Sequence, residues 1–216
     1  MRYIAILDYD HLDHSLFMKA FSEAMARQSG CSGIILHGDS AYTERLIQIG
    51  TMREDAVIRS SRDLNHRIVA LLADSGVSGI GINGYQKNII QKKGDTLLAD
   101  DKWMEERPAG THLVLSNLVW DIEKHRVVSF PLRTMAEALF KQLNRDAIII
   151  FSANDSDESL FMGKINENQP GNIEGPEMQH NIPGDLNPPP KNSFLSSIKA
   201  FGDLPDTSGM HQFHSE

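Results

Sequence analysis

The chain has 216 residues, of which 40% are hydrophobic and 23% charged, and this composition is typical of a globular protein with one ample domain, with or without a tail. Its formal net charge of −8 gives no electrostatic footprint for nucleic acid or an anionic membrane, and its single cysteine excludes an intrachain disulfide and a cysteine-based zinc cage. No apolar run approaches the roughly 20 residues of a membrane span, and the N-terminal run is too short for a signal peptide, so we expect a cytoplasmic protein.

Apolar patterning predicts strands that alternate with helices along the first two thirds of the chain. Strands are expected at 3–7, 31–36, 76–82, 88–91, 112–115, 118–120, 126–128 and 147–151. Helices are expected at 16–25, 41–49, 62–74 and 132–143. The segment 94–109 is polar, and we expect it to be irregular with one helical turn. The alternation predicts an α/β fold, a three-layer αβα sandwich with a mainly parallel sheet.

The composition changes after about Asn154, and most of the nine prolines lie between Pro170 and Pro205. We therefore predict a domain at 1–154 and a Pro-rich, disordered or loosely draped tail at 155–216. A small apolar patch at helical spacing interrupts this tail, and it either docks on the body or a partner or forms only a fleeting helix; its residues are Phe194, Leu195, Ile198 and Phe201.

A turn of four residues, His37-Gly38-Asp39-Ser40, separates the second strand from the helix that follows. A glycine lets the backbone approach a ligand, and the free N–H groups of a helix start attract anions, so the turn could seat a phosphate or carboxylate. The alternative is an ordinary turn in which Asp39 or Ser40 caps the helix.

Three more segments follow this turn in order: Gly50-Thr51-Met52-Arg53-Glu54-Asp55, a helix with Asn65 beside an apolar stripe, and Gly79-Ile80-Gly81-Ile82-Asn83-Gly84. Together they resemble the amino-acid kinase superfamily, and most of all the acetylglutamate kinases. Members of that family carry a His-Gly-Gly-Gly loop, a Gly-x-Arg-x-Thr-Asp segment, a helix with an Asn, and a Gly-hydrophobic-x-Gly-x-Asp strand. A weaker match continues from Ser129 to Ser152.

The resemblance implies transfer of the γ-phosphoryl group of ATP, with Mg²⁺, to an acidic amino-acid derivative. In such enzymes glycine loops bind the phosphates, lysines neutralise the transferring group, and an arginine grips a carboxylate. The resemblance also implies a small anionic, amino-acid-like ligand and a homodimer formed through a helix at 66–74. It assigns ligand binding to His37, Gly38, Asp39, Ser40, Arg53, Asn65 and Gly81.

The departures from the family concern its charged groups. Asp8-Tyr9-Asp10 stands where the family's first strand ends in Lys-x-Gly-Gly, and Asp39 replaces the second glycine of the His-Gly loop. Arg133 stands at the position of the family's organising Asp. Lys164 resembles the second catalytic lysine, although its spacing differs, and it is the candidate catalytic residue.

Each candidate binding residue also has an ordinary interpretation. Arg53 could clamp a substrate carboxylate, or it could be a surface arginine paired with Glu54 or Asp55. Asn65 could reach the ligand from its helix or face solvent, and His37 could be a satisfied histidine at a strand end.

Asp8 and Asp10 support a rival hypothesis. Haloacid-dehalogenase-like phosphatases carry an Asp-x-Asp after their first strand, with one Asp as nucleophile and both near Mg²⁺. The Gly-Thr that usually follows is replaced here by His11-Leu12. The acidic residues could hold a metal, or the loop could simply be solvated.

The sequence thus favours a divergent or catalytically impaired member of the amino-acid kinase superfamily that binds a small carboxylate or phosphate ligand. An active ATP-dependent kinase for an acidic amino-acid derivative and a Mg²⁺-dependent phosphatase are the alternatives.

Overall fold

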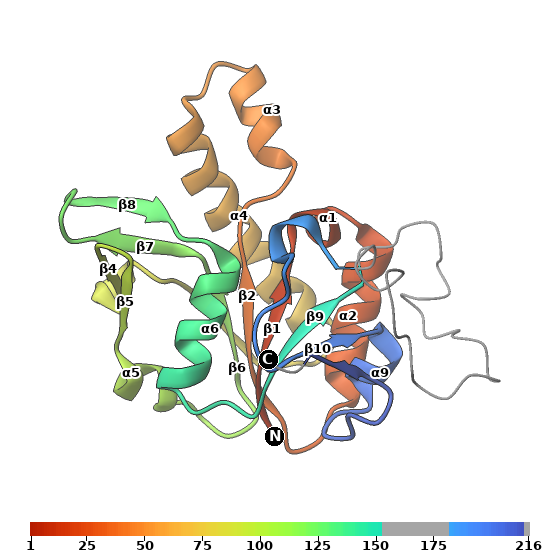
Figure 1. Ribbon diagram of the computed structural model, residues 1–216. Helices are drawn as coiled ribbons and strands as arrows, with labels where there is room; N and C mark the ends of the chain where they lie inside the picture. Colours follow the sequence, from red (N-terminus) through yellow and green to blue (C-terminus); the bar gives the residue numbers. More distant parts are fainter. Residues whose placement is uncertain (153–181, 214–216) are drawn as a thin grey trace.

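A seven-stranded sheet forms the centre of the structure, a computed structural model that describes residues 1–152 and 182–213 (Figure 1). In the order β11-β10-β9-β1-β2-β6-β3, the strands are β11 (His211–Gln212), β10 (Ser193–Ser196), β9 (Ala147–Phe151), β1 (Arg2–Leu7), β2 (Ser32–His37), β6 (His112–Ser116) and β3 (Gly79–Asn83). Only the β10–β11 pair is antiparallel within this sheet. The predicted α/β fold with a mainly parallel sheet is confirmed.

The apolar runs of the sequence become strands that are buried on both faces. In β1, Tyr3, Ala5 and Leu7 belong to one core cluster, whereas Ile4 and Ile6 belong to the other. This alternation follows from the two-residue period of a strand. The first cluster is covered by three helices, which are α2 (Ser15–Arg27), α4 (Arg53–Asp74) and α9 (Ile198–Gly202).

The second face of the large sheet is covered by helix α6 (Leu132–Gln142) together with a four-stranded sheet. In the order β5-β4-β7-β8, its strands are β5 (Thr96–Ala99), β4 (Ile90–Lys93), β7 (Leu118–Asp121) and β8 (Arg126–Ser129), and α5 (Asp101–Glu105) follows β5. The expectation of an irregular segment at 94–109 is therefore wrong for 96–99. These residues form a strand because they pair along the whole length of β4.

A helical hairpin rises from the carboxyl edge of the large sheet (Figure 1). It consists of α3 (Tyr42–Gln48) and the first turns of α4, which begins at Arg53 and not near residue 62 as the apolar stripe predicts. The remaining short elements are α1 (Tyr9–Leu12), η1 (Gln86–Asn88) and η2 (Gly184–Leu186). Among the described residues, no helix is both long and apolar enough to cross a membrane.

Residues 182–213 differ from the expected disordered or loosely draped tail, because they pair with the central sheet and pack into the core. Strand β10 pairs in parallel with β9, and Phe201 is fully buried against Tyr3, Phe21 and Phe151. The apolar patch of this segment therefore docks on the body. The physical reason is that β9 needs a neighbour for its backbone hydrogen bonds and the core needs the aromatic ring.

Candidate functional site

The His37 ring lies at the carboxyl end of β2 in a fully buried network of polar groups. Its Nδ1 donates to the Gly38 carbonyl oxygen over 2.9 Å, and its Nε2 accepts from the Asn65 side-chain nitrogen over 3.1 Å. Burial lowers the pKa of His37 to about 4, against a smaller opposing effect of the Gly38 hydrogen bond. The ring is therefore neutral near pH 7, and both of its nitrogens are used within the protein.

Asn65 joins helix α4 to the sheet. Only 1% of its surface is exposed, and its side-chain nitrogen also lies within hydrogen-bond distance of the Ile82 and Val114 carbonyl oxygens. Its side-chain oxygen lies over Gly81, where a Cβ would overlap it. The interpretation of Asn65 as a solvent-facing residue is wrong, because Asn65 is buried between His37 and the backbone of Gly81. We call these three residues the asparagine network.

Asp8 and His11 form a second buried pair, at the carboxyl end of β1. The Asp8 Oδ1 accepts from the His11 backbone N–H and from His11 Nδ1, at 3.0 and 2.6 Å. The other ring nitrogen of His11 lies 2.8 Å from the Ser152 carbonyl oxygen. Asp10 is exposed in the first turn of α1. The described residues contain no group of three or more His, Cys, Asp or Glu side chains arranged to hold a metal.

Arg53 lies at the start of α4 in the projecting hairpin. Its Nη2 is 3.2 Å from the Glu44 Oε1 of α3, and 69% of its side chain is exposed. Neither Glu54 nor Asp55 is its partner, since Glu54 pairs instead with Arg126 of β8 over 2.6 Å. The surface interpretation of Arg53 thus fits the geometry, with a different acidic partner.

A pocket of about 320 Å³ opens where the carboxyl ends of the parallel strands meet. In open α/β sheets this edge is the usual place for a ligand. The pocket is lined by five segments of the chain, and its lining residues are Tyr9, Gly38, Asp39, Asn117, Ser129, Phe130, Pro131, Leu132 and Asp185. We call this the carboxyl-edge pocket. Of the predicted ligand-binding residues, it contains Gly38 and Asp39.

Asn117 fixes the geometry of the carboxyl-edge pocket. Its backbone N–H donates to the His37 carbonyl oxygen at 2.8 Å, and its side-chain nitrogen donates to the Phe130 carbonyl oxygen at 2.9 Å. These bonds hold the turn after β2 against the loop before α6. The Asn117 Oδ1 is buried and has no partner within the described residues. A ligand or a water that donates to it would satisfy this oxygen.

The electrostatics of the pocket are mixed. Asp39 and Asp185 contribute carboxylates, and no lysine or arginine is among the lining residues of this described pocket. Burial raises the pKa of Tyr9, and the negative charges of Asp39, Glu44, Asp13 and Asp10 raise it further. The amino end of α6, where no side chain caps the helix, borders the same pocket through Pro131 and Leu132 and favours negative charge.

The remaining candidates lie elsewhere. Ser40 is buried, and its Oγ accepts from the Tyr42 backbone N–H over 3.3 Å, but the N-cap of α3 is Ala41, so neither Asp39 nor Ser40 is the predicted cap. Lys164 lies outside the described residues. Sequence reasoning missed Asn117 and Asp185. A signal existed for Asn117, which directly follows the buried strand β6, but Asp185 reaches the pocket from a segment expected to be disordered.

Comparison with known proteins supports the fold and nothing finer. No protein-family model matches the chain, and no curated protein does. Solved structures do match. N-acetylglutamate synthase from Neisseria gonorrhoeae, complexed with coenzyme A and N-acetyl-glutamate, superposes with a TM-score of 0.62 at 14% identity, over 100% of this chain and 60% of that one.

Two kinases show the same likeness. An isopentenyl phosphate kinase gives a TM-score of 0.60 at 13% identity over 94% of both chains. Aspartate kinase from Synechocystis gives 0.58 at 14% identity, over 69% of this chain and 28% of that one. The chain thus spans under a third of that aspartate kinase and about three fifths of the synthase. These neighbours show that the chain has the fold of the amino-acid kinase superfamily.

Proposed function

We propose that this protein is a divergent, non-catalytic member of the amino-acid kinase superfamily, most like the acetylglutamate kinases, and that it binds a small amino-acid-like ligand. The observation that carries the proposal is the composition of the carboxyl-edge pocket. Two carboxylates, Asp39 and Asp185, line this pocket together with the amino end of α6, so its lining carries both negative groups and a partial positive charge. An α-amino acid matches both, because its ammonium group is attracted to the carboxylates and its carboxylate to the helix end.

The size of the pocket agrees with this ligand. About 320 Å³ lies at the lower end of the range for small-molecule sites, which is roughly 300–1,000 Å³. Asn117 also lines the pocket, and its Oδ1 is an acceptor without a partner among the described residues.

The lining of the carboxyl-edge pocket fits a triphosphate with its Mg²⁺ less well than it fits an amino acid. Phosphoryl transfer requires cations around the transferring group, yet the lining residues contribute Asp39 and Asp185 and no cation. At the end of β1, where the family has a lysine, Asp8 is already engaged by His11. This is the reason for proposing ligand binding without phosphoryl transfer.

Thermal unfolding with candidate ligands tests the proposal. L-glutamate and L-aspartate are expected to raise the Tm, whereas N-acetyl-L-glutamate, which lacks the ammonium group, is expected to raise it less. Asp39→Asn should abolish the effect, and Glu123→Gln, an exposed residue in the β7–β8 turn, serves as the matched control. Absence of stabilisation by any amino acid, or an unchanged shift in Asp39→Asn, contradicts the proposal.

The same measurements distinguish the two alternatives. An active kinase would be stabilised by ATP with Mg²⁺ and would consume ATP in the presence of an acidic amino-acid derivative. If Arg53 clamps the substrate, Arg53→Ala removes the response to the amino acid. We expect no change, because Arg53 is not among the lining residues. The phosphatase alternative gains no support, because Asp8 Oδ1 is held by His11 and the fold is that of amino-acid kinases.

We also propose a homodimer through the second half of α4, residues 66–74, as the family resemblance implies. Several side chains on this stretch face away from the core, among them His66, Arg67, Ala70 and Ala73. Light scattering coupled to size exclusion measures the mass directly, and a mass of one chain at all concentrations contradicts the dimer.

A further inference from the structure

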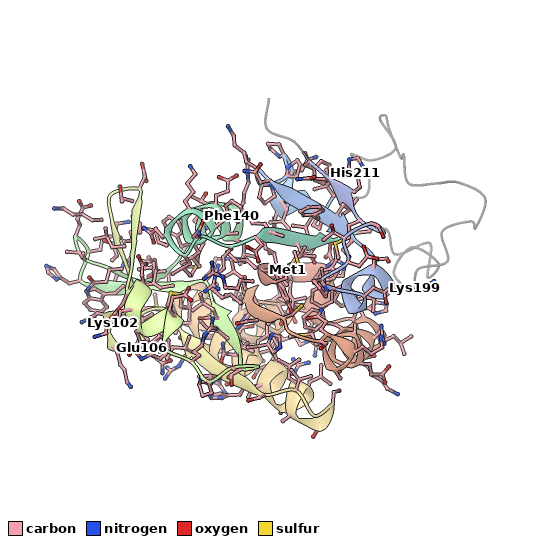
Figure 2. All side chains as sticks on the ribbon, turned by 90° about the horizontal axis from the view of Figure 1, so that it is seen from below. Met1, Lys102, Glu106, Phe140, Lys199 and His211 are labelled. Carbon is pink, nitrogen blue, oxygen red and sulfur yellow. The ribbon has the colours of Figure 1, made fainter. Side chains whose placement is uncertain are left out.

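Two arginines lie close together at the edge of the large sheet opposite to the carboxyl-edge pocket. Arg107 follows α5, and Arg145 follows α6 just before β9. Figure 2 views the molecule from below, with Met1 marking the start of β1 and Lys102 and Glu106 marking α5 and its end. We call Arg107 and Arg145 the arginine pair, and the carboxylate of Glu105 bonds to Arg145.

Arg145 has hydrogen-bonding capacity that the protein does not use. It is 4% exposed, and its Nη2 donates to the Glu105 Oε1 over 2.6 Å. Its Nε and Nη1 are buried without a partner in the described part of the chain, and the same is true of the Arg107 Nη1. Buried donors on charged groups are normally satisfied, so three such atoms in one place indicate a missing acceptor.

The local charge also lacks an anion. Arg2, Arg107 and Arg145 contribute three cations, while Glu105 and Asp146 contribute two carboxylates. Arg2 Nη1 lies 3.9 Å from Glu105 Oε2, and Asp146 accepts from the Arg2 backbone N–H over 2.6 Å. One additional negative charge would balance this group.

The Arg145 guanidinium acts on the pKa of Arg107, and Arg107 acts on the pKa of His112. Burial lowers the pKa of Arg107, and the Arg145 guanidinium lowers it further. Burial likewise lowers the pKa of Arg145, which Glu105 partly offsets. His112 of β6 adds no charge, because burial and then Arg107 hold its pKa at about 4. An anion at the arginine pair would relieve the repulsion between the two guanidinium groups.

We propose that Arg107 and Arg145 form a binding site for a small phosphate-class oxyanion, distinct from the carboxyl-edge pocket. A tetrahedral oxyanion offers several acceptor oxygens in different directions, which suits three N–H-bearing atoms that come from two guanidinium groups. The site lies at the amino ends of β1, β6 and β9, so it stands independently of the proposed function.

Access to the site requires a local movement. The unpartnered nitrogen atoms are covered, but 39% of the Glu105 side chain is exposed and α5 has only five residues. Rotation of the Glu105 carboxylate into solvent frees the Arg145 Nη2. The oxyanion then takes the place of Glu105 or binds beside it.

The experiment measures thermal unfolding of the full chain with inorganic phosphate, against sodium chloride at equal ionic strength and against acetate. At ten times the dissociation constant, phosphate should raise the Tm by about 3–6 °C. Arg107→Gln should remove this shift, while Lys102→Gln, on the neighbouring exposed surface of α5 with 84% of its side chain exposed, should retain it.

A second measurement uses the wild-type protein and needs no variant. In ¹⁵N-labelled wild-type protein, the Arg145 Nε–H signal should shift with phosphate and not with chloride. The proposal is overturned if phosphate changes neither the Tm nor this signal, or if Arg107→Gln responds like the wild type. If acetate raises the Tm as much as phosphate does, the assignment of the site to phosphate-class oxyanions is overturned.

Discussion

The side-chain nitrogen of Asn65 lies 3.1 Å from the Nε2 of His37 and donates to it. This contact ties helix α4 to the end of β2 at the point where the chain turns toward the carboxyl-edge pocket. The same nitrogen lies 3.2 and 3.0 Å from carbonyl oxygens of β3 and β6, so one amide connects a helix to three neighbouring strands. Two residues that the sequence resemblance assigns to ligand binding therefore hold the scaffold beneath the pocket.

Gly81→Ala tests the asparagine network. A Cβ at this position would overlap the Asn65 Oδ1 and lie 2.9 Å from the Val69 Cγ2. We expect the variant to lose about 1–3 kcal/mol of unfolding free energy, because the amide must move and its hydrogen bonds weaken. Urea unfolding followed by circular dichroism measures the loss.

Gly79→Ala on the same strand is the control for this prediction. Its Cβ would meet the Leu72 Cδ1 at 3.5 Å, an ordinary contact distance. Equal stabilities of the two variants would show that the asparagine network does not constrain position 81.

The buried His37 makes the stability depend on pH in a definite direction. Its pKa is about 4 in the folded protein and near 6.5 in the unfolded chain, so the unfolded chain binds more protons between these values. The contribution of neutral His37 is therefore complete above pH 6.5 and is lost as the pH falls toward 4. At pH 5 the loss relative to pH 7 is on the order of 2 kcal/mol.

Comparison of wild type with His37→Gln at pH 7 and pH 5 isolates this effect. The pKa of His112 is also lowered to about 4, but His112 is present in both proteins, so its contribution to the pH dependence cancels in the comparison. The difference in unfolding free energy between the two pH values should be smaller in His37→Gln. An equal pH dependence in both proteins contradicts the assignment to His37.

The sequence predicts best the strands that are apolar throughout, and it misses β5, β10 and β11. The expected strand at 147–151 coincides with β9, because five consecutive apolar residues can only be buried on both faces. Strand β5 escapes prediction because it belongs to a small sheet with one exposed face, where Leu98 is 44% exposed. Strand β10 escapes because only two of its four residues, Phe194 and Leu195, are apolar and it follows a Pro-rich stretch.

The site was harder to predict than the fold, because its parts come together only through tertiary structure. Asn65, Ile68 and Leu72 share one helical stripe, a spacing that places Asn65 in the core. The family resemblance suggested a ligand role instead. Asp185 reaches the carboxyl-edge pocket across a long stretch of chain, which no local pattern reveals.

Asp8→Asn tests whether the first strand ends in a structural pair or a metal site. The substitution removes the charge that His11 contacts within the core, and breaking a buried pair costs about 3 kcal/mol or more. Asp10→Asn, at an exposed position, should change the unfolding free energy by less than about 0.5 kcal/mol. Stabilisation of the wild type by Mg²⁺ that disappears in both variants would instead support the metal hypothesis.

Phe201→Ala tests whether the C-terminal segment is integral to the domain. The ring is fully buried and lies 5.5 Å from Tyr3, 5.2 Å from Phe21 and 5.1 Å from Phe151 between centroids. Its removal leaves a cavity among these rings, so we expect a loss of about 3–5 kcal/mol in unfolding free energy. Leu98→Ala, at a partly exposed site in β5, is the control with a small effect. A draped tail that contributes nothing to the core predicts no difference between the two variants, and guanidinium unfolding of both proteins decides between these outcomes.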